Sequence, residues 1–153
     1  MNKKLIECSL QYLKDQGAYA TSILIYKKNE LVFYHTNNKK FEDIYLSSKD
    51  LYEKCHLAKR AHYALNNNKS TTLLWDTIVP ENEESHILNE YREKYSHTHG
   101  ITFLENLEDD LKIGLTLVGR RSDINLPLDI LANKRVIMNE LTKIEHFCKF
   151  SYT

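Results

Sequence analysis

The chain has 153 residues, 42% of them hydrophobic and 27% charged, and this composition predicts a single globular domain over 1–153 rather than a disordered segment. Lysine plus arginine equals aspartate plus glutamate, at 21 each, so no overall field would attract nucleic acid or an anionic membrane. Cys8, Cys55 and Cys148 are widely separated, which argues against a disulfide framework or a thiolate zinc site, and no run approaches the ~20 apolar residues of a membrane helix. We therefore expect a cytoplasmic, reduced protein with no cofactor, no metal and no membrane segment.

The N-terminal part of the chain predicts a helix followed by a β-hairpin. Apolar residues recur at helical spacing near residues 2–16, and Gly17 would cap the end of this helix. Two β-rich runs, 21–26 and 31–34, flank a short polar connection and predict an antiparallel hairpin.

The next part predicts a loop and a second helix. The polar segment 36–42 is expected to be a surface loop, and residues 45–46 to form a short strand. Ser47 or Ser48 would then cap a helix whose buried stripe comprises Leu51, Cys55, Ala58, His62 and Leu65.

A strand and a third helix are expected after the asparagine run 66–68. Residues 71–75 read as a short strand that ends in the single tryptophan. Pro80 and the acidic cluster 81–84 would open the third helix, where acidic side chains suit the positive end of the helix dipole. Its predicted buried stripe comprises Ile87, Leu88, Tyr91 and Tyr95.

The C-terminal part predicts a second hairpin and a long helix. The third helix is expected to end before Gly100, and a strand to follow at 101–104. A turn and a second strand at 111–118 would complete the hairpin. A wide apolar stripe predicts a terminal helix over about 126–146.

This order of elements predicts an α/β protein of the α+β type. Two antiparallel hairpins cannot form a doubly wound parallel sheet, which needs a helix between successive strands. We expect a central antiparallel sheet of about five strands covered by helices, the general architecture of PAS-, GAF- and profilin-like sensor domains. Fold alone does not fix function.

Four local features occur together between residue 45 and the C-terminus. They are a helix that carries Tyr52, a strand that ends in Trp75, an aromatic-bearing helix that runs into Gly100-Ile101-Thr102, and the long terminal helix. In this order they resemble the N-terminal sensory domain of LuxR-type transcriptional regulators, in the divergent set without the acyl-homoserine-lactone signature. The resemblance implies a sensory domain that signals through a ligand-dependent change of dimer or domain docking.

The resemblance also implies the kind of ligand and its contacts. We expect a small apolar or amphipathic molecule between sheet and helices. The candidate ligand-binding residues are Tyr52, His56, Trp75, Tyr91, Tyr95 and Phe103. Lactone-responsive members carry an Asp-Pro pair between the Tyr helix and the Trp strand. The corresponding stretch 59–63 has no acid, so a lactone held in the usual manner is not expected.

The expected partners follow from the same resemblance. The family's helix-turn-helix normally follows the sensor, and this sequence stops at Thr153. We therefore expect a homodimer that contacts DNA only through a separate domain absent from this chain, as a separated sensor or as a stand-alone relative.

Ordinary structural roles remain open for the candidates. Trp75 could simply be core, His56 could lie on a half-exposed helix face, and the third-helix tyrosines could be a packing stripe. His97 and His99 alternate as a metal pair would, but lack a third ligand nearby. The basic residues Arg120, Arg121, Lys134 and Arg135 are expected to be solvated surface.

Two other classes of function compete with the sensor interpretation. One is a protein–protein interaction or dimerisation module with a filled core and no ligand, which an open cavity beside Trp75 would argue against. The other is a small enzyme, which would need converging titratable groups in a cleft. The sequence offers no nucleophile, phosphate-loop or zinc-protease motif, so we expect no enzyme.

Overall fold

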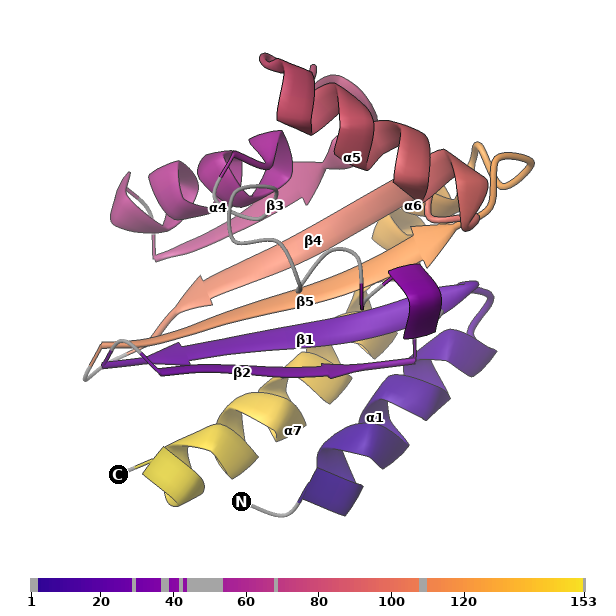
Figure 1. The fold of residues 1–153 in the computed structure, drawn as a ribbon. Coiled ribbons are helices and arrows are strands. Elements are labelled where there is room, and N and C mark those ends of the chain that lie inside the picture. The colour runs from indigo at the N-terminus through magenta and orange to yellow at the C-terminus, as the bar shows by residue number, and fades with distance from the viewer. Residues whose placement is uncertain are drawn as a thin grey trace.

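The computed structural model describes residues 3–28, 30–36, 39–41, 43, 54–67, 69–107 and 110–152. Its centre is a five-stranded antiparallel sheet with helices on both faces (Figure 1). The spatial order is β2-β1-β5-β4-β3, and the strands are β1 (Ala20–Lys27), β2 (Glu30–His35), β3 (Ser70–Leu74), β4 (His99–Asn106) and β5 (Leu111–Gly119). The predicted fold class and both hairpins are therefore confirmed.

The two hairpins meet in the middle of the sheet. β1 pairs with β2, β4 pairs with β5, and β1 also pairs along its whole length with β5. In this register Leu24 lies opposite Gly114, and Gly114 lies opposite Leu104 on the other side. A row across three strands therefore has a glycine at its centre.

One face of the sheet carries the main hydrophobic core. It is covered by α1 (Lys3–Asp15), α6 (Leu126–Ala132) and α7 (Lys134–Tyr152), and α1 packs against α7 below the sheet in Figure 1. The helices contribute apolar residues at helical spacing and the strands contribute alternate residues. The largest fully buried side chains of this core include Ile6, Leu10, Leu13, Ile23, Ile101, Phe103, Leu115 and Leu117.

The end of the first helix matches its prediction. Gly17 has a φ of +117°, a backbone conformation that favours glycine, and its N–H donates to the carbonyl of Lys14.

The opposite face is covered less densely. α4 (His56–Asn67), the 3₁₀ turn η1 (Trp75–Thr77) and α5 (Glu83–Lys94) lie on this side, above the sheet in Figure 1. Residues 39–41 are helical, and the Phe41 side chain is buried. The prediction of a surface loop over 36–42 is wrong there, because Phe41 is an apolar anchor within a polar segment. The predicted strand at 45–46, the Ser47 or Ser48 cap and Leu51 lie outside the described residues.

Three helix predictions need correction. The second helix begins at His56, after the non-helical Cys55, and His62 of its predicted buried stripe is exposed. In α5 the buried residues are Ser85, Leu88 and Arg92, whereas Ile87 is exposed and Tyr91 is half-buried. The terminal helix is interrupted at Asn133, whose N–H bonds to the carbonyls of Asp129 and Ile130, so α6 and α7 are separate elements. The apolar periodicity continues on both sides of Asn133, so the sequence pattern does not indicate that the helix is interrupted there.

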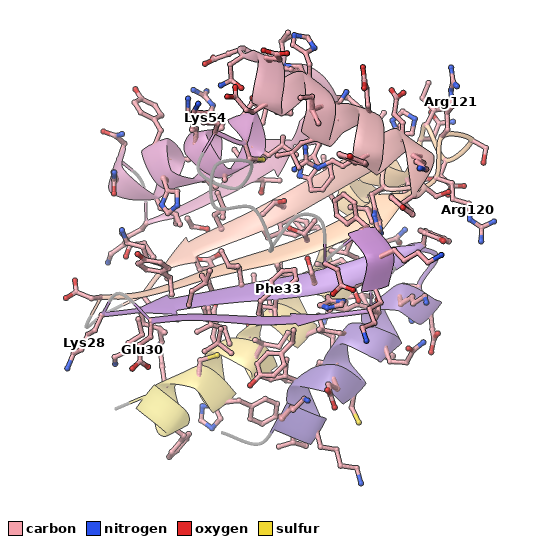
Figure 2. The ribbon with its side chains drawn as sticks, viewed as in Figure 1. Lys28, Glu30, Phe33, Lys54, Arg120 and Arg121 are labelled. Carbon is pink, nitrogen blue, oxygen red and sulfur yellow. The ribbon has the colours of Figure 1, made fainter. Side chains whose placement is uncertain are left out.

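Charged residues mark both ends of the sheet. Figure 2 shows Lys28 and Glu30 at the β1–β2 turn and Arg120 and Arg121 on the loop after β5, at the opposite end. Among the described helices, none is both long and apolar enough to cross a membrane.

Candidate functional site

A cavity of about 150 Å³ lies on the α4–α5 side of the sheet. Its walls come from all five strands, from α4 and α5, and from Trp75 and Phe41. The strand positions follow from period-2 alternation: Thr102 and Leu104 face this cavity, while Ile101 and Phe103 face the main core. Most of the wall is apolar, and its larger apolar side chains are Leu24, Phe33, Phe41, Leu57, Leu65, Leu73 and Leu104. Among the described residues, this apolar hollow lies between the sheet and the helices α4 and α5.

Gly114 explains why the sheet face is hollow at this point. It lies on the central strand β5 between Leu24 and Leu104. A methyl group added at Gly114 would come within 3.2 Å of the Leu104 side chain, so any larger residue would fill the floor of the cavity. A missing side chain in the central strand therefore leaves space between two leucines.

Trp75 forms the wall at one end of the cavity. Its ring lies directly against Gly100, so that even one added methyl group would clash with it. Its indole Nε1–H donates to the Thr102 hydroxyl at 2.9 Å, and Thr102 lies 2.8 Å from the Thr116 hydroxyl. Glycine below and threonine beside it fix the orientation of the ring.

Arg92 brings a buried positive charge to the same end. The side chain is 4% exposed and lines the cavity from α5. Its guanidinium carbon lies 5.4 Å from the Trp75 ring centroid, within the range of a cation–π contact. Its Nη2 donates to the Cys55 sulfur at 3.1 Å, which joins α5 to the start of α4.

His97 lines the cavity near Arg92 and is 1% exposed. Its ring centroid lies 4.5 Å from that of Phe41 and 5.9 Å from that of Tyr19. Within the part of the chain that the structure describes, neither ring nitrogen has a hydrogen-bond partner. Burial lowers the pKa of His97 to about 4, with smaller effects from Arg92 and His35, so the ring is neutral at neutral pH.

The other end of the cavity has different polar groups. The Tyr26 and His62 rings meet edge to face, with centroids 6.2 Å apart. Lys112 pairs with Tyr26 across β1 and β5, and its Nζ lies 3.5 Å from the Asn66 side-chain oxygen. Thr116 lies four positions after Lys112 on β5, which is about 13 Å of extended chain. The Trp75 and Lys112 ends can therefore contact different parts of one ligand.

The predicted site residues fall into distinct places. Trp75 lines the cavity, although it lies in the 3₁₀ turn after β3 rather than in the strand. His56 is buried at the start of α4 but does not line the cavity. Burial, then Arg92 and His86, lowers the pKa of His56 to about 4. Tyr52 lies outside the described residues.

The remaining predicted residues do not line this cavity. Phe103 points to the opposite face, into the main core, because its strand alternates and Thr102 takes the cavity side. Tyr91 on α5 and Tyr95 directly after it are half-buried, and Arg92 takes the inward position of the helix. Tyr95 contacts Phe41 with ring centroids 6.3 Å apart and therefore supports the wall from behind.

Sequence reasoning missed Arg92, His97, Thr102 and Thr116. Alternation in the second hairpin could have assigned both threonines to one face, opposite the apolar residues Ile101 and Phe103. Arg92 gave no such signal, because an arginine in a charged helix normally reads as solvent-exposed.

The two histidines considered as a metal pair face different surroundings. His99 Nδ1 lies 2.9 Å from the Asp76 carboxylate, and its Nε2 lies 3.1 Å from the Arg121 carbonyl, whereas His97 lies among aromatic rings. Among the described residues, no three histidine, cysteine or acidic side chains gather as metal ligands would. Cys148 is buried in the main core, where burial raises the pKa of its thiol to about 12.

Several solved structures have a fold similar to that of this chain. CepR2 from Burkholderia cenocepacia, an N-acylhomoserine lactone-dependent LuxR family transcription factor, matches with a TM-score of 0.63 and 11% identity, over 82% of this chain and 73% of that one. The VqsR LBD domain from Pseudomonas aeruginosa matches with a TM-score of 0.59 and 17% identity, over 93% of each chain. SdiA in complex with octanoyl-rac-glycerol matches with a TM-score of 0.57 and 12% identity, over 95% of this chain and 61% of that one.

These similarities establish the fold. The chain has the architecture of the ligand-binding domains of LuxR-family regulators, as the sequence resemblance implied. It spans less than two thirds of the SdiA chain. No protein-family model and no curated protein sequence matches the chain.

Proposed function

We propose that this chain is a sensory domain that binds a small, largely apolar molecule in the cavity between its sheet and α4 and α5. The observation that carries the proposal is the cavity itself, which opens beside Trp75 in a domain whose other sheet face is densely packed. Apolar walls with a few convergent polar groups are typical of small-molecule sites. An interaction module with a filled core would have no need of this space.

The structural neighbours support the same function. CepR2 is described as lactone-dependent, and SdiA was solved with octanoyl-rac-glycerol. A sensory role in transcription regulation therefore agrees with the fold. Any contact with DNA would belong to a separate domain, because the net charge of this chain is zero.

The cavity volume restricts the ligand class. At about 150 Å³ the cavity is comparable to engineered cavities that hold one benzene ring, and it is smaller than most drug-sized sites. A compact aromatic molecule or a short acyl chain fits this volume. A longer ligand would require the wall to move.

The signal would arise from the elements that enclose the ligand. α4 is joined to α5 by the Arg92–Cys55 contact and by a Lys54–Glu84 ion pair of 2.8 Å (Lys54 is labelled in Figure 2). A ligand that contacts both helices would favour one arrangement of the pair and so change how a dimer or a neighbouring domain docks.

Native mass spectrometry of the purified protein tests the proposal, because it reports retained ligand and stoichiometry together. We expect a bound species below about 300 Da, either retained or captured from a metabolite mixture, at about one molecule per chain. Gly114→Val places a side chain in the cavity and should abolish this species, whereas Thr142→Val on the exposed side of α7 should retain it. Equal retention by both variants would contradict binding in this cavity.

A further inference from the structure

The largely apolar cavity also has charged side chains in its lining. Its lining includes two cationic side chains, Arg92 and Lys112, and no acidic side chain among the described residues. Arg92 lies with His97 and Trp75 at one end, and Lys112 lies at the other. Among the described residues the lining therefore offers positive charge and no negative charge, which suits a ligand that carries a negative group.

His97 marks the end at which that charge would lie. A neutral imidazole has one N–H donor and one acceptor nitrogen, and both nitrogens of His97 lack partners within the described part of the chain. A buried donor without an acceptor costs free energy that a ligand atom can recover. The His97 ring lines the cavity, so an acceptor atom of a ligand can reach it.

Arg92 supplies the complementary charge. Its guanidinium has five N–H donors in a planar fork that matches the two oxygens of a carboxylate. The Trp75 ring and the Cys55 sulfur hold this fork in place from two sides. A group fixed in this way loses little conformational freedom when it binds an anion.

We propose that the Arg92–His97 end of the cavity selects a ligand with a carboxylate head group and an apolar body. The carboxylate accepts hydrogen bonds from the Arg92 guanidinium and from the His97 N–H, beside the edge of Trp75. The apolar body lies over Gly114 between Leu24 and Leu104. The inference rests on the proposed function and narrows its ligand to small aromatic or short-chain acids.

The test uses acids with neutral partners of the same shape. Affinities are measured by calorimetry at neutral pH for benzoate against benzamide and for hexanoate against hexanamide. We expect each acid to bind about tenfold more tightly than its amide, because charge-assisted hydrogen bonds are roughly twice as strong as neutral ones.

Three histidine variants locate the carboxylate within the cavity. His97→Phe keeps a ring against Phe41 but removes both nitrogens. It should weaken benzoate binding about tenfold and benzamide binding by a smaller factor, because the amide oxygen accepts only a neutral hydrogen bond from His97. His62→Phe is the control at the other end, since His62 also lines the cavity but is exposed and lies beside Tyr26. His97→Gln retains an N–H donor and should recover part of the lost benzoate affinity. Retained benzamide binding shows that each variant is folded.

The outcomes separate this inference from the proposed function. If the amides bind as tightly as the acids, the carboxylate inference is wrong and ligand binding stands. If His62→Phe rather than His97→Phe weakens benzoate, the charge lies at the Lys112 end and the assignment to Arg92 and His97 is wrong. If neither acids nor amides bind and the purified protein retains no ligand, the sensor proposal fails as well.

Discussion

Trp75 shows how one residue position shapes the candidate site. Its ring occupies the space that Gly100 leaves free, and its indole N–H is satisfied by Thr102 inside the domain. Thr102 in turn lies 2.8 Å from Thr116 on the next strand, so the tryptophan is tied to two central strands. The orientation of the Trp75 ring thus depends on two threonine hydroxyl groups. The aromatic residues of the sequence alone do not indicate this dependence.

Removal of the Thr102 hydroxyl should therefore destabilise the domain. Thr102→Val keeps the side-chain shape but leaves the Trp75 N–H buried without its acceptor. We expect the free energy of unfolding to fall by about 1–3 kcal/mol in urea denaturation. Thr142→Val is the control, because its hydroxyl donates to the Met138 carbonyl on an exposed part of α7. A change within about 0.5 kcal/mol is expected there, and equal effects in both variants would show that the indole bond has no special weight.

Two buried histidines make the stability of the domain depend on pH. The folded-state pKa values of His56 and His97 are both about 4, below the ordinary 6.5, chiefly because burial disfavours the charged ring. The unfolded chain therefore takes up protons that the folded chain does not as pH falls below 6.5. The stabilising contribution is complete above this pH and is lost as pH falls from 6.5 towards 4.

This linkage predicts a measurable slope. Between about pH 6.5 and pH 5, each histidine should lower the free energy of unfolding by about 1.4 kcal/mol per pH unit once its unfolded form is protonated. Urea denaturation at a series of pH values should show the slope roughly halved in His97→Phe, which removes one of the two groups. An unchanged slope in that variant would mean that His97 titrates normally in the folded domain.

At the scale of elements, periodicity predicted most of the structure. The first helix, both hairpins and the strand before Trp75 lie within two residues of their predicted bounds, because each has an apolar face that repeats along the chain. The errors have local causes. Asn133 interrupts a stripe that remains apolar on both sides, and Arg92 takes an inward position of α5 because the Trp75 ring and Cys55 contact it there.

The start of α5 gives a prediction with a natural control. The Asn82 side chain accepts a hydrogen bond from the Ser85 N–H, and Ser85 donates to the Lys54 carbonyl beside α4. Asn82→Ala should cost about 1 kcal/mol of unfolding free energy. Asn125 precedes α6 without a side-chain capping bond, so Asn125→Ala should cost less than about 0.5 kcal/mol. Equal losses by chemical denaturation would show that the Asn82 cap contributes nothing specific.

At the scale of the whole molecule, the sequence predicted the class of architecture but not which residues line the cavity. The central pairing of β1 with β5 joins segments about 90 residues apart, and local patterns do not encode such a register. The hollow row of Leu24, Gly114 and Leu104 exists only because of that pairing. The same register turns the Phe103 side chain, predicted as a ligand contact, to the opposite face, so that it does not line this cavity.

The cavity also makes a prediction about the stability of the entire domain. A ligand that binds the folded chain alone, present at about 100 times its dissociation constant, should add about 2.7 kcal/mol to the free energy of unfolding. For a domain of this length that corresponds to a rise in Tm of about 5–10 °C. A thermal-shift screen of small acids, acyl chains and aromatic compounds measures this rise in Tm directly.

Gly114→Val is the control for this screen. The variant should fold but show no rise in Tm with any compound, because its side chain occupies the cavity floor. If no compound raises the Tm of the unaltered protein, the dimerisation module without a ligand becomes the better account, since it needs the fold and not the space beside Trp75.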